Sequence, residues 1–301
     1  MKFFDLHCDT IGECYNKKIP LRKNNLHIAL ERAKELGEYS QVFAIWIPDE
    51  LRGKDALKYF DAVSDCFYKE IKKNNDLISL YGENKKTPIK AILSVEGGSA
   101  CGGTIDGLLH LYEKGVRLIT LTWNDKNEIG SGAFSEGGLT DFGKEFIKEA
   151  EKLGITLDVS HLNRQSFFEF EKIAEKPFIA SHSNADIVNN KYARKRNLSE
   201  EQIRIIRERN GLIGFNFCQD FIEDGKIEGV DALYHQIEYM LSLGCEDIIA
   251  IGSDFDGCQV HSDFYGIQKI PSVYMRLKEK GIHEKILNKI FFENAEKFFE
   301  K

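Results

Sequence analysis

The hydrophobic positions of this chain form short apolar runs that alternate with longer amphipathic segments. Near-continuous apolar runs are typical of parallel β-strands that are covered on both faces. Eight such runs occur, at residues 3–9, 41–48, 90–98, 117–123, 156–161, 178–183, 212–218 and 248–254. Eight strands that alternate with helices favour an α/β fold of the (β/α)8 TIM-barrel type, although an open, doubly wound parallel sheet has the same alternation.

The segments between these runs have helical spacing and helix-end signals. Residues 141–153 read DFGKEFIKEAEKL, which places apolar side chains on one helical face, and Gly154 follows as a stop. Ser199, two glutamates and Gln202 form a capping-box pattern that predicts the start of another helix. Helices between the strand-like runs are typical of a (β/α)8 barrel.

Length and composition are consistent with one domain. The chain has 301 residues, of which 42% are hydrophobic and 30% charged, and barrels of roughly 250 residues routinely form a single domain. No proline-rich or serine-rich linker and no internal repeat interrupts the sequence. We therefore expect one domain over residues 1–301, in which helices from about residue 264 to 301 cover the barrel end or form a subunit contact.

Charge and cysteine usage argue against several classes of partner. The net charge is −7, and basic residues are scattered apart from the run at 191–196, so no nucleic-acid partner is expected. No apolar run approaches the roughly 18 residues of a membrane span, and the N-terminus lacks a signal segment. Seven cysteines without regular spacing indicate reduced thiols. These features together predict a cytoplasmic protein.

Metal-binding or acid–base side chains stand at the ends of several predicted strands, while the strand interiors are almost free of charge. In chain order they are His7, Asp9, Glu96, His161, His182 and Asp254. In a barrel the carboxyl ends of all strands form one rim, so side chains far apart in the sequence converge there. His7 and Asp9, two residues apart in a strand, point to the same face.

A metal centre explains this convergence better than separate structural roles do. Each residue alone has an ordinary interpretation, as a hydrogen-bonded histidine or a salt-bridged carboxylate. Buried together, their uncompensated charges would be strongly unfavourable. Imidazole and carboxylate groups are typical ligands of zinc. Five of these groups, His7, Asp9, Glu96, His161 and His182, with one carboxylate as a bridge, suit two cations about 3.5–4 Å apart. We therefore expect two divalent cations, with zinc, cobalt and manganese as candidates.

Seven short segments follow one another along the chain in the order DLHCDT, LSVEGG, LTWN, LDVSH, IASHSNA, RNLS and IGSDFDG. This series resembles the membrane (renal) dipeptidase family of metallopeptidases. The resemblance implies a barrel that binds two Zn²⁺ ions per chain and hydrolyses small peptides, and it suggests a homodimer. It also implies that His7 and Asp9 bind the first zinc ion, that His161 and His182 bind the second, and that Glu96 bridges both.

The resemblance assigns further roles near the strand ends. Asp254 matches the catalytic acid/base of the family, which accepts a proton from the attacking water and passes it to the leaving amine. Arg196, in the RNLS segment, matches an arginine that binds the substrate's terminal carboxylate, although Arg194 is an alternative for this role. Trp123 and Asn124 are expected to contact substrate. Many family members carry a histidine where this chain has Trp123, so rate and substrate preference stay open.

Two other functions are compatible with the same residues. Another binuclear metal hydrolase on this scaffold would act on a cyclic amide, lactone or phosphoester, because barrels carry many chemistries. A glutamate bridge and an H-x-D pattern on the first strand favour the dipeptidase over this alternative. A non-catalytic peptide-binding protein would have no need for an acid/base at Asp254. The preferred dipeptide and its stereochemistry, including a D-residue at the C-terminal position, are not predicted.

Overall fold

The computed structural model describes residues 1–300 and contains one parallel β-sheet. Its strands are β1 (Lys2–Cys8), β2 (Glu38–Trp46), β3 (Ile78–Leu80), β4 (Ile89–Glu96), β5 (Leu118–Thr120), β6 (Thr156–Asp158), β7 (Ile179–Ala180), β8 (Leu212–Phe215) and β9 (Ile249–Ile251). Strand β2 pairs with both β1 and β4, so eight strands close into a ring in the order β1-β2-β4-β5-β6-β7-β8-β9. The predicted barrel is confirmed, and the open doubly wound sheet is wrong.

Each of the eight predicted apolar runs overlaps one strand of the ring, although β1, β2 and β4 begin one to three residues earlier than predicted. Strand β3 was not predicted and lies outside the ring, where it pairs only with the first half of β4. It is three residues long and has a serine at its centre, so neither length nor alternation distinguishes it from a loop. The barrel is therefore the predicted one with a short strand added at its side.

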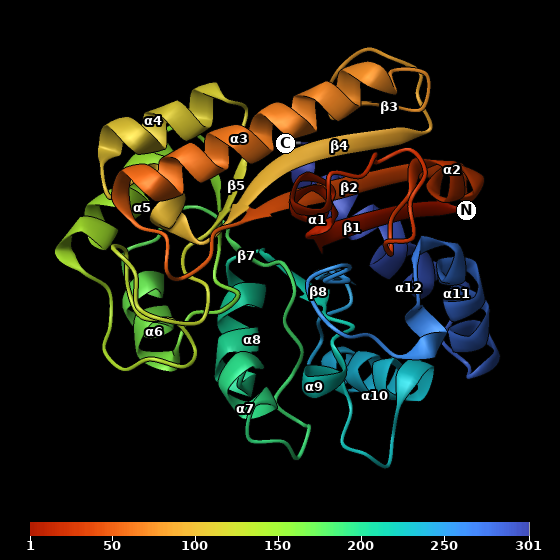
Figure 1. The fold of residues 1–301 in the computed structure, drawn as a ribbon. Helices are drawn as coiled ribbons and strands as arrows, with labels where there is room; N and C mark the ends of the chain where they lie inside the picture. The colour runs from red at the N-terminus through yellow and green to blue at the C-terminus, as the bar shows by residue number, and fades with distance from the viewer. Residues whose placement is uncertain (301) are drawn as a thin grey trace.

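Helices surround the ring of strands (Figure 1). The α-helices are α1 (Thr10–Lys17), α2 (Leu30–Ala33), α3 (Gly53–Lys73), α4 (Ile105–Glu113), α5 (Asp141–Lys152), α6 (Arg164–Glu171), α7 (Ala193–Arg196), α8 (Glu200–Glu208), α9 (Gln219–Ile222), α10 (Gly229–Ser242), α11 (Ile270–Glu279), α12 (Glu284–Asn288) and α13 (Asn294–Phe299). Short 3-10 segments are η1 (Lys34–Leu36), η2 (Gly98–Cys101), η3 (Ser262–Phe264) and η4 (Ile267–Lys269), and η5 (Lys289–Glu293) is a π-helical turn.

Local signals explain where the predicted helices begin and end. The Thr140 hydroxyl accepts a hydrogen bond from the Gly143 amide and caps α5, and Gly154 after this helix has a φ of 75°. The capping box between Ser199 and Gln202 is present at the start of α8. Both helices therefore form as their sequences predict.

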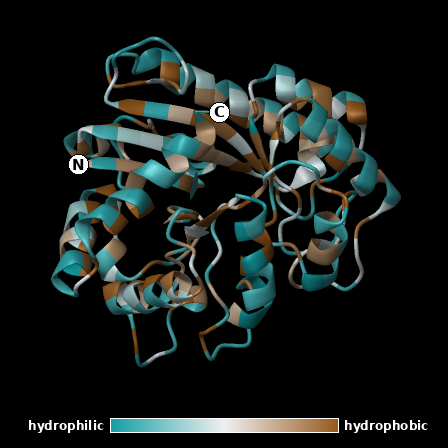
Figure 2. Ribbon diagram, turned by 180° about the vertical axis from the view of Figure 1, so that it is seen from behind, coloured by the Kyte–Doolittle hydropathy of each residue, from teal (hydrophilic) through white to brown (hydrophobic). Residues whose placement is uncertain are grey.

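The apolar interior of the barrel is closed at the N-terminal ends of the strands. Buried side chains from seven strands meet Phe292 and Ala295 of the last two helical segments in one cluster. Phe299 stacks on Phe4 of β1 with ring centroids 5.4 Å apart. Figure 2 shows the apolar strands at the centre and helices of mixed hydropathy around them. With this end covered, the carboxyl ends of the strands are the open end of the barrel.

Two further predictions concern the whole chain. All seven cysteines carry free thiols, and five of them are buried. Within residues 1–300, no helix has the length and hydropathy required to cross a membrane.

Candidate metal centre

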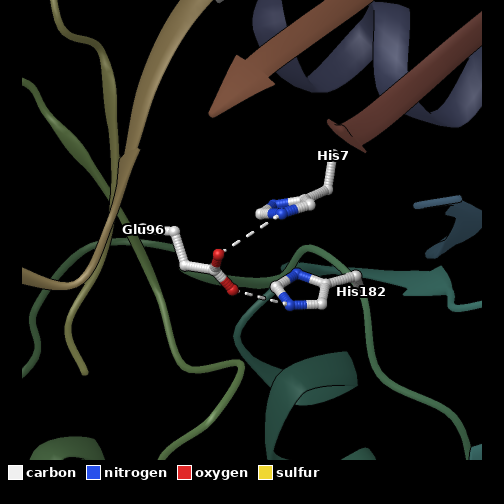
Figure 3. Close-up of side chains that lie close together, drawn as sticks. All are labelled: His7, Glu96 and His182. Atoms are coloured by element: carbon white, nitrogen blue, oxygen red, sulfur yellow. Dashed lines mark ion pairs between the residues drawn. The ribbon is translucent and has the colours of Figure 1, made fainter. Parts of the chain in front are cut away.

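The side chains predicted at the strand ends meet at the open end of the barrel. Glu96, the last residue of β4, lies between two groups of predicted ligands. Its Oε2 atom is 3.8 Å from Nε2 of His7, while its Oε1 atom is 2.8 Å from Nε2 of His161 and 3.3 Å from Nε2 of His182. Figure 3 shows the imidazole rings of His7 and His182 near each other, both pointing at the Glu96 carboxylate. One carboxylate thus faces two separate sets of nitrogen atoms.

Two carboxylates complete the side of the cluster at His7. The Nε2 atom of His7 is 3.3 Å from Oδ2 of Asp9 and 4.0 Å from Oδ1 of Asp254. Asp9 follows the end of β1 directly, and Asp254 lies in the loop after β9. The residues predicted as ligands and as acid/base are therefore all within one cluster.

The donor atoms of this cluster fit divalent cations. His7, Glu96 and His182 each present one ligand atom within 4.8 Å of the others, and His7, Asp9 and Asp254 do the same. Nε2 of His7 and Oδ1 of Asp9 are buried without a hydrogen-bond partner. The Nε2 atoms of His161 and His182 face each other at 2.8 Å. Buried imidazole and carboxylate groups gathered this closely, two of them with an atom that has no hydrogen-bond partner, are what a bound metal ion satisfies.

Hydrogen bonds at the far side of the imidazole rings direct Nε2 into the cluster. Nδ1 of His161 donates to Oδ1 of Asn124 at 3.0 Å. Nδ1 of His182 lies 2.7 Å from the Ser181 hydroxyl, which donates to Asp158 at 2.5 Å. Such partners orient metal-ligating histidines and fix the tautomer with a free Nε2. Asn124, predicted to contact substrate, lines the pocket and also holds His161.

Asp254 and His7 are positioned by polar groups that the sequence analysis did not identify. Asn216 donates to Oδ2 of Asp254 at 2.9 Å, which leaves Oδ1 toward His7. The buried Asp5 accepts hydrogen bonds from the backbone and hydroxyl of Ser253, at 2.8 and 2.6 Å, and from the backbone of His7. This contact fastens β1 to the loop that carries Asp254.

The backbone is strained at several of these positions. His161, Asp254 and Asp256 have φ values of 68°, 59° and 69°, in the left-handed region that non-glycine residues rarely adopt. Gly257 follows without a side chain, and a Cβ atom there would overlap the carboxylates of Asp9 and Asp254. Strain of this kind persists where the surroundings fix the conformation, and it is concentrated at functional sites.

Burial dominates the electrostatics of the cluster. Burial raises the pKa of Glu96 well above its usual range, although His7 opposes this, and it lowers the pKa values of His161 and His182 well below theirs. For His7 burial lowers the pKa, but the nearby Glu96 and Asp9 carboxylates outweigh it and raise the pKa to about 10. Near neutral pH the metal-free cluster therefore has neutral imidazoles at His161 and His182, while His7 and its neighbour Glu96 together hold at least one proton.

Loading the metal-free protein with Zn²⁺ is expected to release protons. A ligand must lose its proton before it binds a cation, and His7, with a pKa of about 10, is protonated at pH 8. Zinc affinity should therefore rise with pH between about 7 and 10, and about one proton or more should leave each chain. Titration calorimetry at pH 8 in two buffers of different ionisation enthalpy measures this number. Equal heats in both buffers would contradict a protonated His7.

A pocket of about 270 Å³ opens above the cluster. Its lining includes Asp9, Glu96, Asn124, His161 and Asp254, together with aromatic residues of the rim. Trp123 lines the pocket and packs edge-on against Trp46, with ring centroids 4.8 Å apart. Its ring centroid is 6.4 Å from that of His161. Trp123 thus forms a wall beside the cluster.

Arg196, the last residue of α7, is a buried cation without a partner. Its side chain is 5% exposed, and none of its three guanidinium nitrogen atoms has a hydrogen-bond partner. Burial lowers its pKa, and the Asp254 and Glu96 carboxylates counteract this. The guanidinium also lies over the ring of Phe221, 5.2 Å from its centroid. Arg194, the alternative from the sequence, is exposed and bonded to Asn189.

Comparisons with known proteins give one consistent result. The model of the family described as membrane dipeptidase (peptidase family M19) matches residues 1–301. An uncharacterized protein in the pqqA 5′ region of Klebsiella pneumoniae is 31% identical over 215 residues, which are 67% of this chain and 78% of that protein.

Two solved structures share the fold over the whole chain. A metallo peptidase from Rhodobacter sphaeroides, liganded with a phosphinate mimic of the dipeptide L-Ala-D-Ala, has a TM-score of 0.92 and 23% identity, covering 100% of this chain and 99% of that chain. A dipeptidase described as a metallo peptidase of family M19 has a TM-score of 0.91 and 24% identity, covering 100% and 98%.

Proposed function

Because this chain belongs to the membrane dipeptidase family, peptidase family M19, and is a metal-dependent dipeptidase, we propose that its rim cluster binds two zinc ions and that Arg196 binds the substrate carboxylate. His7 and Asp9 would hold one ion, His161 and His182 would hold the other, and Glu96 would bridge them. The orientation of the two Glu96 oxygen atoms toward different histidines supports this bridge. Cations bound there would polarise the scissile carbonyl and lower the pKa of a water molecule toward about 7.

The unpartnered guanidinium of Arg196 is the observation that carries the substrate assignment. A buried arginine with no acceptor is unfavourable in the free protein, and a substrate carboxylate would satisfy it with charge-assisted hydrogen bonds. The Asp254 and Glu96 carboxylates raise the pKa of Arg196, and Phe221, over whose ring the guanidinium lies, lines the pocket. A free carboxylate next to the scissile bond is a property of a dipeptide.

Side chains around the cluster would have separate roles in hydrolysis. Asp254 would accept a proton from the attacking water and deliver it to the departing amine, which is otherwise a poor leaving group. Arg196 would align the C-terminal residue so that the scissile carbonyl lies over the cluster. Trp46 and Trp123 would exclude water from one side of the pocket. The phosphinate ligand of the Rhodobacter sphaeroides protein mimics L-Ala-D-Ala, so we include D-residues at the C-terminal position among the substrates.

A panel of peptides tests this function directly. The zinc-loaded protein should release free amino acids from L,L and L,D dipeptides, and a chelator should abolish the activity. An N-blocked dipeptide and a tripeptide should be poor substrates, because neither places both a free amino group and a free carboxylate one residue from the scissile bond. Hydrolysis of a lactone or phosphoester in place of every dipeptide would contradict the proposal.

Changing Arg196 to alanine is expected to raise the KM for dipeptides. Charge-assisted hydrogen bonds to a buried carboxylate contribute about 1.5–3 kcal/mol of binding free energy. Their loss should lower kcat/KM roughly 10- to 100-fold. A dipeptide amide, which lacks the carboxylate, should be hydrolysed equally slowly by both proteins. The exposed Arg194→Ala is the matched control and should behave as the unmodified protein. Equal losses on the dipeptide and its amide would assign Arg196 a structural role.

A further inference from the structure

One wall of the pocket contains a carboxylate that the proposed chemistry does not use. Helix α1 presents Gly12, Glu13 and Asn16 to the pocket, and Trp46 and Tyr59 stand beside them. Glu13 lies one helical turn beyond Asp9, because its backbone amide bonds to the Asp9 carbonyl. Glu13 therefore stands one helical turn along α1 from Asp9, the proposed metal ligand, and both residues line the pocket.

This wall faces Arg196 across the barrel. Trp46 ends β2 and Tyr59 belongs to α3, which follows β2, whereas Arg196 ends α7, which follows β7. In the ring of eight strands, β2 and β7 are four positions apart and therefore opposite each other. Figure 1 shows α3 and α7 on opposite sides of the molecule. A dipeptide whose carboxylate meets Arg196 would direct its N-terminal residue toward Glu13.

Of the carboxylates that line the pocket, Glu13 has a side chain with few polar contacts in the described part of the chain. Asp9, Glu96 and Asp254 belong to the metal cluster, and Asp256 accepts hydrogen bonds from the Thr10 hydroxyl at 2.5 Å and the His27 amide at 2.7 Å. Glu13 pairs only with Lys17, at 2.5 Å, across one turn of α1. Lys17 is 55% exposed, and exposed pairs of this spacing are weak, so another cation can replace it.

The shape of this wall suits a long side chain with a positive charge at its tip. A Cβ built on Gly12 would meet no atom within 4 Å, which leaves space beside Glu13. The rings of Trp46 and Tyr59 line this wall and offer apolar surface for the methylene groups of such a side chain. Among the pocket residues within the described part of the chain, five are carboxylates and none is lysine or arginine.

We propose that the enzyme prefers dipeptides with an N-terminal arginine or lysine, whose side chain is bound by Glu13. This inference rests on the proposed function, because the orientation of the substrate follows from Arg196. Arginine and citrulline have nearly the same shape and differ in charge, so they isolate the contribution of Glu13. With an N-terminal arginine, kcat/KM should be about tenfold higher than with citrulline.

The test compares Arg-Ala with citrulline-Ala in the zinc-loaded enzyme. In Glu13→Gln the ratio of the two kcat/KM values should fall to about one, and in Glu13→Lys citrulline should become the better substrate. The control Glu145→Gln removes the same charge from an exposed position on α5 and should keep the original ratio. Citrulline-Ala serves as the reference within each protein, which corrects for any change in folding.

The outcomes separate this inference from the proposed function. Hydrolysis of both dipeptides with equal kcat/KM would overturn the preference and leave the dipeptidase intact. A preference for arginine that persists in Glu13→Gln would overturn the role of Glu13. Failure to hydrolyse either dipeptide, with zinc bound, would overturn the proposed function and this inference together.

Discussion

Replacing Asp254 with asparagine is expected to lower kcat for dipeptides by two to four orders of magnitude, the usual contribution of a general acid/base. Asparagine has the same shape and retains the contact with Asn216, but it cannot accept a proton from water or deliver one to the amine. Burial raises the pKa of Asp254 to about 6, although the charge of His7 opposes this.

Zinc content distinguishes this effect from loss of the metal centre. The ligands proposed for both ions lie on other residues, so Asp254→Asn should keep about two zinc ions per chain by elemental analysis. Asp220→Asn makes the same chemical change at an exposed carboxylate and should leave kcat unchanged. If Asp254→Asn retains kcat within tenfold of the unmodified protein, another group must carry the proton.

The fold was predictable because its main signal, an alternation of apolar runs with amphipathic helical segments, is visible in the sequence. Each strand of the ring overlaps a near-continuous apolar run, and helical patterns with clear caps separate the runs. Strand β3 was not predicted because Ile78–Leu80 is too short to show a pattern of apolar and polar positions. It is a strand because it pairs with β4. Closure of the ring through the β2–β4 pairing is a long-range property that the sequence pattern alone left open.

The residues of the candidate site that stand near strand ends could be predicted from the sequence. His7, Glu96 and His182 converge because each stands near the carboxyl end of its strand. The groups that orient them depend on rotamers and on contacts between distant strands. Asp5 is an example, since its position within the apolar run FFDLH gives no indication that its partner is Ser253, 248 residues away.

The choice between Arg194 and Arg196 depends on burial, which the residue type does not reveal. The sequence offers two arginines in one basic run, and both fit a role in binding a carboxylate equally well. The structure buries Arg196 to 5% exposure without an acceptor and leaves Arg194 at the surface. Only the short helix α7 and its packing near Phe221 decide which side chain turns inward.

Changing Glu96 to alanine is expected to remove zinc from both positions and to abolish activity. Its two oxygen atoms face different histidines, and without a bridge the remaining ligands, His7 with Asp9 and His161 with His182, provide only two groups for each ion. Two protein ligands are fewer than the three that catalytic zinc sites usually have. Elemental analysis after dialysis should therefore find less than about one zinc per chain.

Thermal unfolding separates loss of the metal from loss of the fold in this variant. A cation that binds only the folded state raises its Tm, so zinc should raise the Tm of the unmodified protein and of the exposed control Glu145→Ala. Glu96→Ala should unfold cooperatively with a Tm that zinc does not change, because the ligands that remain no longer form a bridged pair. Two zinc ions in Glu96→Ala, with the zinc-dependent rise in Tm preserved, would mean that each ion is held by its own histidines and that the carboxylate between them is not a bridge.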